Sequence, residues 1–449
     1  MKFISLLGIV ALIGVAWLLS EHKRRFPFRA VLWGVTLQFF LGWFILKTGP
    51  GEALFNACQQ LVSRFISFAN EGNKLMFGPL ANEAVMSKAF GPENALFFAL
   101  VITGIIVLIS TVSSILYHYG VLQLLVRAVA WVMRQTMGTS GSETLSAAAN
   151  IFMGQTEAPL LIKPYLPGMT RSELHCMMVG GFATIAGSVM GVYSGLLKVP
   201  AGHLLTASVM SAPAALLISK IIIPETQVSE TAAGSTAKIE RETINGIDAA
   251  CSGASDGMKL AINVIAMLLA FTSLVAAVNW FLGQGFSQLG WQTQQPLQIL
   301  LGYANAPFAW LMGIPSKDCL AVGQILGERI VLTEFVGYLS LSQQQASLDP
   351  RSYVIATYAL CGFANFGSVA IQIGGIGALV PSRRKDLAQV GIKAMVGGLL
   401  ACYMTGCVVG FLLLTLRCPQ KSTPQRSSIL QPNSAKAAKS ALMLSLMPM

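Results

Sequence analysis

Four polar residues interrupt a strongly apolar stretch of the chain, and their types suit the binding of a small molecule or an ion. Asn150, Gln155, Thr156 and Glu157 all lie within ten residues of one another. An amide both donates and accepts hydrogen bonds, and an ionised carboxylate accepts several. An ionisable residue at membrane depth marks a functional site by default, because burying an unsatisfied charge there is expensive.

The flanking sequence predicts how these residues are held. From Ser142 to Tyr165, an apolar arm of about ten residues lies on each side of the polar group. As a helix, each arm would reach roughly 15 Å, which is half the thickness of a hydrocarbon core. Gly154 and Pro159 break a continuous helix between the arms. We therefore expect a re-entrant hairpin, which survives in a bilayer only when it is buried in protein or lines a cavity.

The composition is that of a membrane protein. The chain has 449 residues, of which 54% are hydrophobic and only 11% are charged. The sequence predicts an all-α polytopic membrane protein with about eight transmembrane helices, each a run long enough to cross a bilayer. The runs are Phe3–Leu19, Val31–Leu46, Leu96–Tyr117, Leu174–Leu197, His203–Ile223, Leu260–Leu282, Val354–Leu379 and Ile392–Leu416.

The net charge of +11 does not indicate a nucleic-acid partner, because the basic residues gather in short loops. Lys23, Arg24 and Arg25 follow the first apolar run, and a second basic cluster begins at Arg383. The positive-inside rule places these loops in the cytoplasm and the N-terminus outside. We expect an integral protein of the plasma membrane, the inner membrane of a bacterium, with lipid as a neighbour. A helix over Val121–Met137 is predicted to lie in the interface.

Part of the sequence is repeated. Glu157 comes 14 residues after Glu143, and Glu334 comes 16 residues after Asp318. A threonine precedes each of the two later glutamates. Further along, the segment from Phe182 to Val189 matches the segment Phe363-Ala-Asn-Phe-Gly-Ser-Val369 apart from one residue of length. Two units, each a hairpin followed by a helix, are therefore predicted.

The two units are predicted to have opposite orientations. Three crossings lie between the hairpins, and an odd number inverts the second unit relative to the first. Inverted repeats whose broken helices meet near the midplane are typical of secondary transporters. Gly, Ser, Thr or Asn residues in the middle of the helix after each hairpin permit it to unwind locally.

The predicted domains follow from this organisation. They are an N-terminal scaffold with an interfacial helix (1–137), a first hairpin repeat (138–223), a cytoplasmic polar loop (224–256), a scaffold helix with an external loop (257–297), a second hairpin repeat (298–416) and a disordered tail (417–449).

The same segments resemble those of a known family, the concentrative nucleoside transporters. The similar segments are Gly154-Gln-Thr-Glu-Ala-Pro-Leu-Leu-Ile-Lys-Pro164, Gly181-Phe-Ala-Thr-Ile-Ala-Gly-Ser-Val189, Thr333-Glu-Phe-Val336 and Gly362-Phe-Ala-Asn-Phe-Gly-Ser368. They occur in family order, and the similarity covers roughly residues 3–416. The resemblance implies a homotrimer that imports nucleosides with sodium or protons, using a scaffold and a mobile transport domain and no cofactor besides the coupling ion.

Carried over by position, the resemblance also implies roles for individual residues. The nucleobase would face Gln155, Thr156, Glu157 and Val189. The ribose would be held by Glu334, Asn365 and Ser368, with Phe363 nearby. A sodium site would use Asn150, the Met153 carbonyl, Thr184 and the Ile185 carbonyl.

Two positions depart from the family pattern. Gly367 stands where the family commonly has serine, which could alter base preference or the packing beside the ribose. Thr333 stands where asparagine is frequent. Asn150 and Thr184 offer hard oxygens, which favours sodium, but Glu157 could instead carry a proton, so a proton-coupled symporter stays an alternative.

Several of these residues could have simpler structural roles. Thr156 could cap a helix, and Phe363 could be ordinary packing. Glu143 and Asp318 are expected to be charges at helix N-termini rather than ligands. An intramembrane serine protease using Ser140 with His175 or His203 is a remote alternative, and a channel is another. The eight cysteines and four histidines show no metal-ligand spacing.

Overall fold

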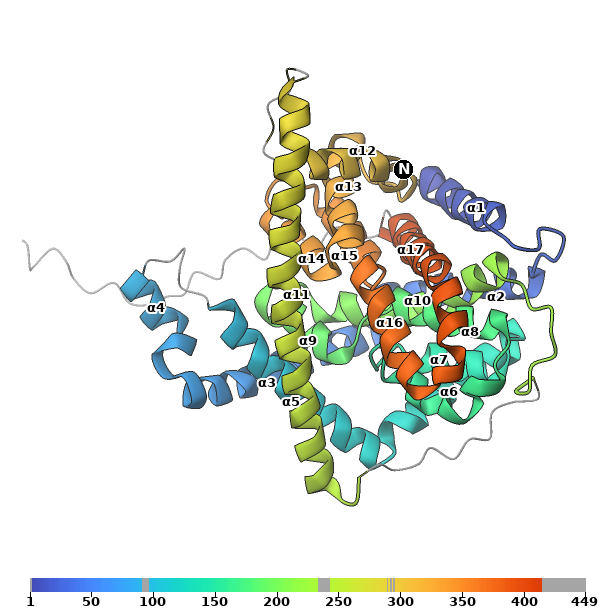
Figure 1. The fold of residues 1–449 in the computed structure, drawn as a ribbon, viewed down its shortest axis with the longest axis horizontal. Coiled ribbons are helices and arrows are strands. Elements are labelled where there is room, and N and C mark those ends of the chain that lie inside the picture. The colour runs from blue at the N-terminus through green and yellow to red at the C-terminus, as the bar shows by residue number, and fades with distance from the viewer. Residues whose placement is uncertain are drawn as a thin grey trace, which may run out of the picture. The chain divides into compact units, whose positions relative to one another are not determined.

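The computed structural model describes residues 2–90, 97–232, 243–288, 290, 293 and 295–413. Every regular element in this part of the chain is a helix, as the composition predicts (Figure 1). The predicted disordered tail lies outside the described residues. Contacts group residues 1–414 into one compact unit, so the finer division into scaffold and transport domains stays a prediction.

Five described segments are long and apolar enough to cross a membrane. They are Phe28–Lys47, Ala99–His118, Arg171–Leu196, Ala201–Ile222 and Pro381–Leu413. The remaining predicted runs are also helical, in α1 (Lys2–Leu18), in the 43-residue α11 (Gly246–Gln288), and in α15 (Pro350–Leu360) with α16 (Phe366–Leu379). The described helices therefore agree with the membrane protein that the composition predicts.

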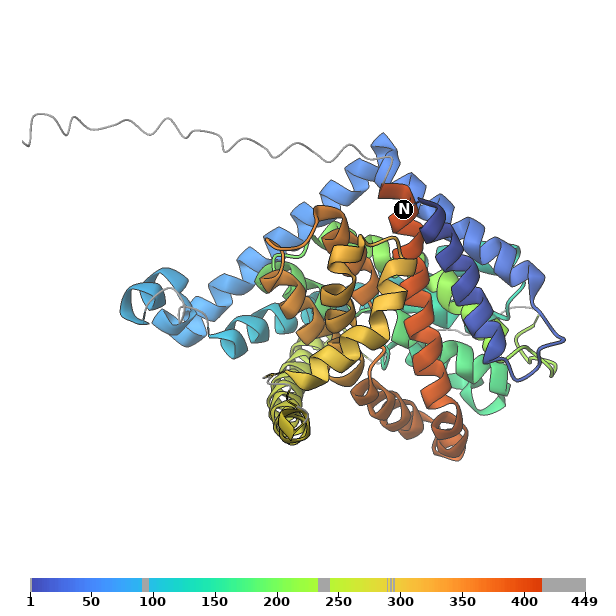
Figure 2. The ribbon, with the colours of Figure 1, turned by 90° about the horizontal axis from the view of Figure 1, so that it is seen from above.

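The outer helices keep much apolar surface exposed, whereas the inner ones do not. Within the spanning windows, only 17% of the residues near α5 (Phe98–His118) are buried, against 89% in α10 (Ala201–Ile222). Helix α5 packs along α11, which Figure 1 shows as one long helix and Figure 2 shows end-on. Exposed apolar side chains on such helices suit contact with lipid or with another subunit.

The helix after each predicted hairpin is broken. After the first hairpin, α8 (Arg171–Ala183) ends before α9 (Gly187–Leu196) begins, with Thr184 in an extended conformation. After the second, α15 (Pro350–Leu360) ends before α16 (Phe366–Leu379) begins. Apart from Ile185 and Phe363, the residues of both breaks are small or polar, in agreement with the local unwinding predicted for these segments.

The polar turn after Asn150 separates two short arms. The first arm is α7 (Gly141–Ala149), of 9 residues, and the second is the 3-10 helix η3 (Ala158–Gly168), of 11 residues. The second arm is not an α-helix because Pro159, Pro164 and Pro167 remove backbone donors. The two arms pack on each other, as the arms of a hairpin should.

The second polar turn also joins two packed helices, α13 (Ser316–Val331) and α14 (Glu334–Gln343). A preceding helix, α12 (Pro296–Leu311), lies along α13. The other described elements are α2 (Phe28–Lys47), α3 (Gly49–Phe77), η1 (Gly78–Ala81), α4 (Glu83–Phe90), η4 (Pro381–Arg383) and α17 (Arg384–Leu413).

The predicted interfacial helix is confirmed as a helix with the predicted bounds, α6 (Val121–Met137). Gly120 and Gly138 flank it with φ values of 79° and 70°, which favour glycine. Arg29 from α2 donates to the carbonyls of Gln135 and Thr136 at its C-terminal end. A cation there also complements the helix dipole.

Candidate functional site

The turn of the first hairpin contacts the helix that follows the second. Gln155 Nε2 donates to Ser368 Oγ at 3.2 Å, and Gln372 Nε2 donates to Gln155 Oε1 at 3.0 Å. Gln372 also donates to the carbonyl of Met178 at 3.2 Å. Two predicted site residues more than 200 positions apart are therefore in direct contact.

A second group of contacts surrounds Glu334, the first residue of α14. Its Oε1 accepts from the hydroxyl of Tyr193 at 2.7 Å, and its Oε2 accepts from Asn365 Nδ2 at 2.9 Å. Asn365 Oδ1 in turn accepts from the backbone N–H of Ser368 at 2.8 Å and caps α16. The hydrogen bonds thus continue from Tyr193 through Glu334 and Asn365 to Ser368 and Gln155.

Tyr193 and Gln372 were not predicted, although both are fully buried at the site. Gln372 is an isolated amide in an apolar helix, a signal that could have identified it, since buried polar groups need partners. Tyr193 gives a weaker signal, because tyrosine is common in apolar helices.

Thr156 and Glu157 differ from these residues because they are exposed. Both line a cavity of about 430 Å³ with residues of α5 and α11. Glu157 Oε2 accepts from the backbone N–H of Gly154 at 3.2 Å, so the carboxylate folds over the turn. The opposite wall is polar, with Ser110, Ser113, Ser114, Ser252, Asp256 and Asn263.

The two remaining predicted ligand residues are less polar. Val189 is half-buried near the start of α9, and Phe363 is buried in the break between α15 and α16. Their assignment to the ligand site stays a prediction.

Asn150 lies where the first arm ends and packs against α8, where a Cβ on Gly180 would lie 3.4 Å from its Nδ2. Its Nδ2 donates to the carbonyl of Ser146 at 3.0 Å, whereas its buried Oδ1 has no hydrogen-bond partner among the described residues. Thr184 Oγ1 donates to the carbonyl of Gly180 at 2.9 Å. A buried oxygen without a hydrogen-bond donor is unfavourable, and a small cation bound to its lone pairs would compensate.

The other two predicted sodium ligands are backbone carbonyls of residues that lie outside the helices. Met153 and Ile185 are buried in the turn and in the break, outside any helix that would use their carbonyls. Gly187 donates to the carbonyl of Phe152 at 3.3 Å, which joins the turn to the break. The four predicted ligand atoms are all oxygens, the donor type that a hard cation prefers.

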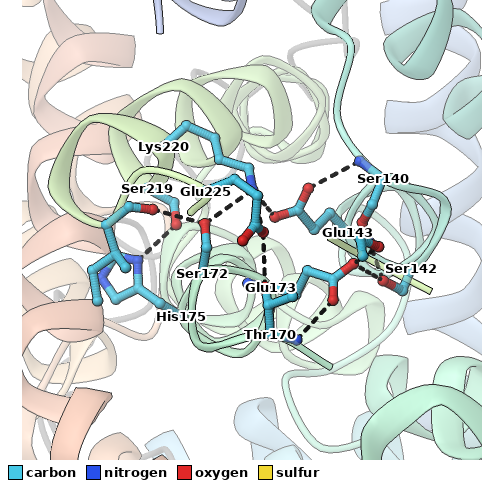
Figure 3. Close-up of polar contacts among 12 residues, drawn as sticks. Ser140, Ser142, Glu143, Thr170, Ser172, Glu173, His175, Ser219, Lys220 and Glu225 are labelled. Carbon is cyan, nitrogen blue, oxygen red and sulfur yellow. Dashed lines mark hydrogen bonds and ion pairs between the residues drawn. The ribbon is translucent and has the colours of Figure 1, made fainter. Parts of the chain in front are cut away.

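Glu143 is a helix N-terminal charge, as predicted. It completes a capping box with Ser140 at the start of α7 and forms an ion pair with the buried Lys220 (Figure 3). Glu173 completes a second capping box at the start of α8 and accepts from Ser142 Oγ at 3.0 Å. These contacts fix the base of the first arm against α8 and α10.

Asp318 occupies the corresponding place in the second hairpin. Its Oδ2 accepts from the backbone N–H of Asp349 at 3.1 Å and from Ser352 Oγ at 2.6 Å. Both donors belong to the N-terminal end of α15. The first turn of each hairpin is therefore tied to the start of the broken helix that follows it.

The contacts of the two histidines exclude the protease arrangement among the described residues. Nδ1 of His175 lies 2.7 Å from Ser219 Oγ (Figure 3), and Nδ1 of His203 lies 3.0 Å from the hydroxyl of Tyr358. The hydroxyl of Ser140 caps α7 and contacts neither ring. A serine nucleophile needs a base within hydrogen-bond reach.

Family comparisons cover most of the chain. The Na+ dependent nucleoside transporter N-terminus family matches residues 7–80, and the Na+ dependent nucleoside transporter C-terminus family matches residues 203–410. Between them, the Gate family, described as nucleoside recognition, matches residues 99–199.

Curated relatives are similar over nearly the whole of this chain. Solute carrier family 28 member 3 of Eptatretus stoutii is 40% identical over 435 residues, covering 93% of this chain and 62% of that protein. Sodium/nucleoside cotransporter 1 of Rattus norvegicus is 38% identical, with 92% and 64% covered. The chain thus spans about three fifths of these animal relatives. The uncharacterized transporter YutK of Bacillus subtilis (strain 168) is 41% identical over 410 residues, with 91% and 99% covered.

Solved structures agree with the fold. CNTnw in an inward-facing substrate-bound state has a TM-score of 0.86 at 38% identity, covering 92% of this chain and 98% of that one. A variant of CNTnw in an outward-facing state has a TM-score of 0.87 at 37% identity, with the same coverage.

Proposed function

The chain belongs to the Na+-dependent nucleoside transporter family, and from this premise we propose that it imports nucleosides by coupling them to an inward sodium gradient. The protein is a polytopic all-α membrane transporter and not an enzyme, because its family is one of transporters. The substrate and the ion are the proposed parts.

The observation that carries the proposal is the hydrogen-bonded chain that links Glu334, Asn365, Ser368 and Gln155. A nucleoside offers ribose hydroxyls as donors and a flat base with donors and acceptors. The carboxylate and the amides can exchange their mutual bonds for bonds to such a ligand, so few polar groups lose partners on binding. Charge-assisted bonds from hydroxyls to Glu334 would be the strongest of these.

We place the ribose at Glu334, Asn365 and Ser368, with Phe363 beside it. The base faces Gln155, Thr156, Glu157 and Val189. This orientation directs the base toward the 430 Å³ cavity that Thr156 and Glu157 line. The polar faces of α5 and α11 across that cavity offer a hydrated path for the substrate.

The proposed sodium site explains how ion and substrate are coupled. Its ligands are Asn150, the Met153 carbonyl, Thr184 and the Ile185 carbonyl. An ion bound there fixes the turn that carries Gln155, which improves the site for the nucleoside, and by linkage the nucleoside improves the site for the ion to the same degree. Proton coupling through Glu157 is the second candidate, supported by the exposed position of that carboxylate in the cavity.

We propose that the transport cycle uses alternating access. The relative CNTnw has been solved in inward-facing, outward-facing and intermediate states. In this chain, the mobile part would contain both hairpins and the broken helices that follow them. The two hairpins would enter the membrane from opposite sides. The exposed apolar surfaces of the outer helices suit a homotrimer surrounded by lipid.

Uptake of labelled nucleoside tests this proposal. Proteoliposomes should accumulate uridine, adenosine or guanosine at least tenfold faster with an inward sodium gradient than with an equal potassium gradient. Counterflow of labelled nucleoside should accompany it, which a channel does not produce. Absence of uptake for all three nucleosides under both gradients would contradict the proposed substrate class.

The proposed orientation has its own test. The basic cluster at Arg383 should be cytoplasmic by the positive-inside rule. A cysteine placed by Ser382→Cys, in a protein whose Cys58, Cys251 and Cys418 are replaced by serine, should therefore react with an impermeant thiol reagent only after permeabilisation. Labelling of this cysteine in intact cells would contradict the proposed orientation. A cysteine at Gln284, predicted to be external, is the matched control.

A further inference from the structure

Arg329 is a buried charge that the site described above does not use. It lies in α13, two residues before that helix ends, and its side chain is 0% exposed. No ion pair among the described residues joins it to a carboxylate. A buried guanidinium without a paired anion is unfavourable, so its contacts must compensate for the loss of water.

The contacts of Arg329 lie at the C-terminal end of α15. One terminal nitrogen donates to the carbonyl of Ala359, the last residue but one of that helix. Tyr338, in α14, donates from its hydroxyl to the carbonyl of Thr357 at 2.8 Å. The last carbonyls of a helix lack partners within it and form the negative end of its dipole. The second hairpin thus supplies a cation and a donor to the end of α15.

The other terminal nitrogen of Arg329 reaches Cys402 of α17, at 3.2 Å from Sγ. The same sulfur contacts the carbonyl of Cys361 at 3.2 Å and that of Ala183 at 3.6 Å. Cys361 begins one helix break and Ala183 ends the helix before the other. Arg329 and Cys402 therefore lie where the two breaks meet.

The backbones of the two breaks are in close contact at this point. A Cβ on Gly362 would lie 2.5 Å from the carbonyl oxygen of Phe182 and 2.8 Å from Cys402 Sγ, so only glycine fits. A small displacement of the end of α15 would consequently move both breaks.

Arg329 also packs against the helix that begins at Glu334. A Cβ on Gly337 of α14 would lie 3.5 Å from Arg329 Cβ, which shows how closely the two arms pack around it. The segment from Ala359 to Asn365 is held by Arg329 at one end and by Glu334 at the other. Both holding residues belong to the second hairpin.

We propose that Arg329 is a positioning residue for the ribose end of the site, a fixed cation that holds the second break as the coupling ion holds the first. The inference rests on the proposed function, because it assigns the ribose to Glu334 and Asn365. Asn150, beside the helix that precedes the first break, presents an unsatisfied oxygen, whereas Arg329 brings a guanidinium to the end of the helix that precedes the second. Arg329 itself does not contact the nucleoside; it sets the place of the groups that do.

The test compares Arg329→Gln and Arg329→Lys with the control Arg351→Gln. Arg351 is half-buried and also donates to helix-end carbonyls, those of Gly313 and Gly410, but it lies outside both breaks. Each variant is reconstituted into liposomes. Uptake is measured for the best substrate among uridine, adenosine and guanosine, and for its 2′-deoxy and 3′-deoxy analogues.

The unmodified protein should disfavour at least one deoxy analogue by about tenfold or more, since a site built for a hydroxyl rejects its absence. Arg329→Gln should raise the KM of the parent nucleoside about tenfold and reduce that discrimination to threefold or less. The sodium concentration for half-maximal uptake, at saturating nucleoside, should stay within about threefold. Arg329→Lys, which keeps the charge, should retain most of the discrimination, and Arg351→Gln should retain all of it.

A purely structural role would lower the amount of inserted protein without changing the discrimination, and that result in Arg329→Gln would overturn the inference. If Arg329→Gln fails to insert, Arg329→Lys decides. Lysine keeps the charge but cannot reproduce both contacts of the guanidinium, so a raised KM with the discrimination kept supports positioning, and an unchanged KM overturns it. Uptake of no nucleoside by the unmodified protein would instead overturn the proposed function.

Discussion

Glu334→Gln should abolish most nucleoside transport while the protein stays folded and inserted. Both carboxylate oxygens accept hydrogen bonds, from Tyr193 at 2.7 Å and from Asn365 at 2.9 Å. Glutamine has the same shape, but its amide nitrogen would face one of these donors, and it carries no charge to strengthen bonds from the ribose. A loss of about 3 kcal/mol is expected for such charge-assisted bonds, which corresponds to a decrease of roughly 100-fold in the efficiency of uptake.

The matched control is Glu328→Gln, six positions earlier in the same hairpin. Glu328 is only partly buried, and no hydrogen bond or ion pair among the described residues joins it to the proposed site. The Glu328→Gln variant should retain near-normal uptake. Near-normal uptake by a correctly inserted Glu334→Gln variant would contradict the assignment of Glu334 to ribose binding.

The position of Glu334 could be predicted because it depends on local sequence. A threonine and a glutamate at matched places in two apolar segments are visible without a structure, and so are Gly154 and Pro159, which break the first hairpin. The same holds for the bounds of α6, which two glycines fix. Features that depend on neighbouring residues, such as turns and helix bounds, can therefore be predicted from the sequence.

Contacts between distant segments could not be predicted in the same way. Gln155 meets Ser368 and Gln372, more than 200 residues away, and Tyr193 meets Glu334 from another helix. Nothing in the sequence pairs these residues, because a polar residue in an apolar helix has many possible partners. The role of Arg329 is hidden for the same reason: near a predicted turn, an arginine suggests an aqueous surface, whereas the structure buries it.

The repeat is informative where its two halves differ. At the first break an oxygen of Asn150 is left without a partner among the described residues, and at the second break Arg329 already supplies a cation. We therefore expect the sodium dependence of transport to reside in the first half of the chain.

Asn150→Ala should shift the sodium dependence of uptake to higher concentration before it abolishes transport. The change removes one hard oxygen from the proposed site and leaves the other ligands in place. A shift of about tenfold in the half-saturating sodium concentration, at constant pH, corresponds to about 1.4 kcal/mol of lost ion binding. The maximal rate at saturating sodium should fall by less than about threefold, because Asn150 is not proposed to touch the nucleoside.

Asn305→Ala provides a control of the same residue type and local geometry. Asn305, in α12, donates through Nδ2 to the carbonyl four residues earlier at 2.9 Å, as Asn150 does, but its Oδ1 accepts from the hydroxyl of Tyr403 at 3.0 Å. Only the asparagine with the unsatisfied oxygen should alter the sodium dependence. If a pH gradient fully drives uptake in sodium-free medium, and Asn150→Ala leaves that uptake unchanged, the coupling ion is a proton, and Glu157 becomes the residue expected to carry it.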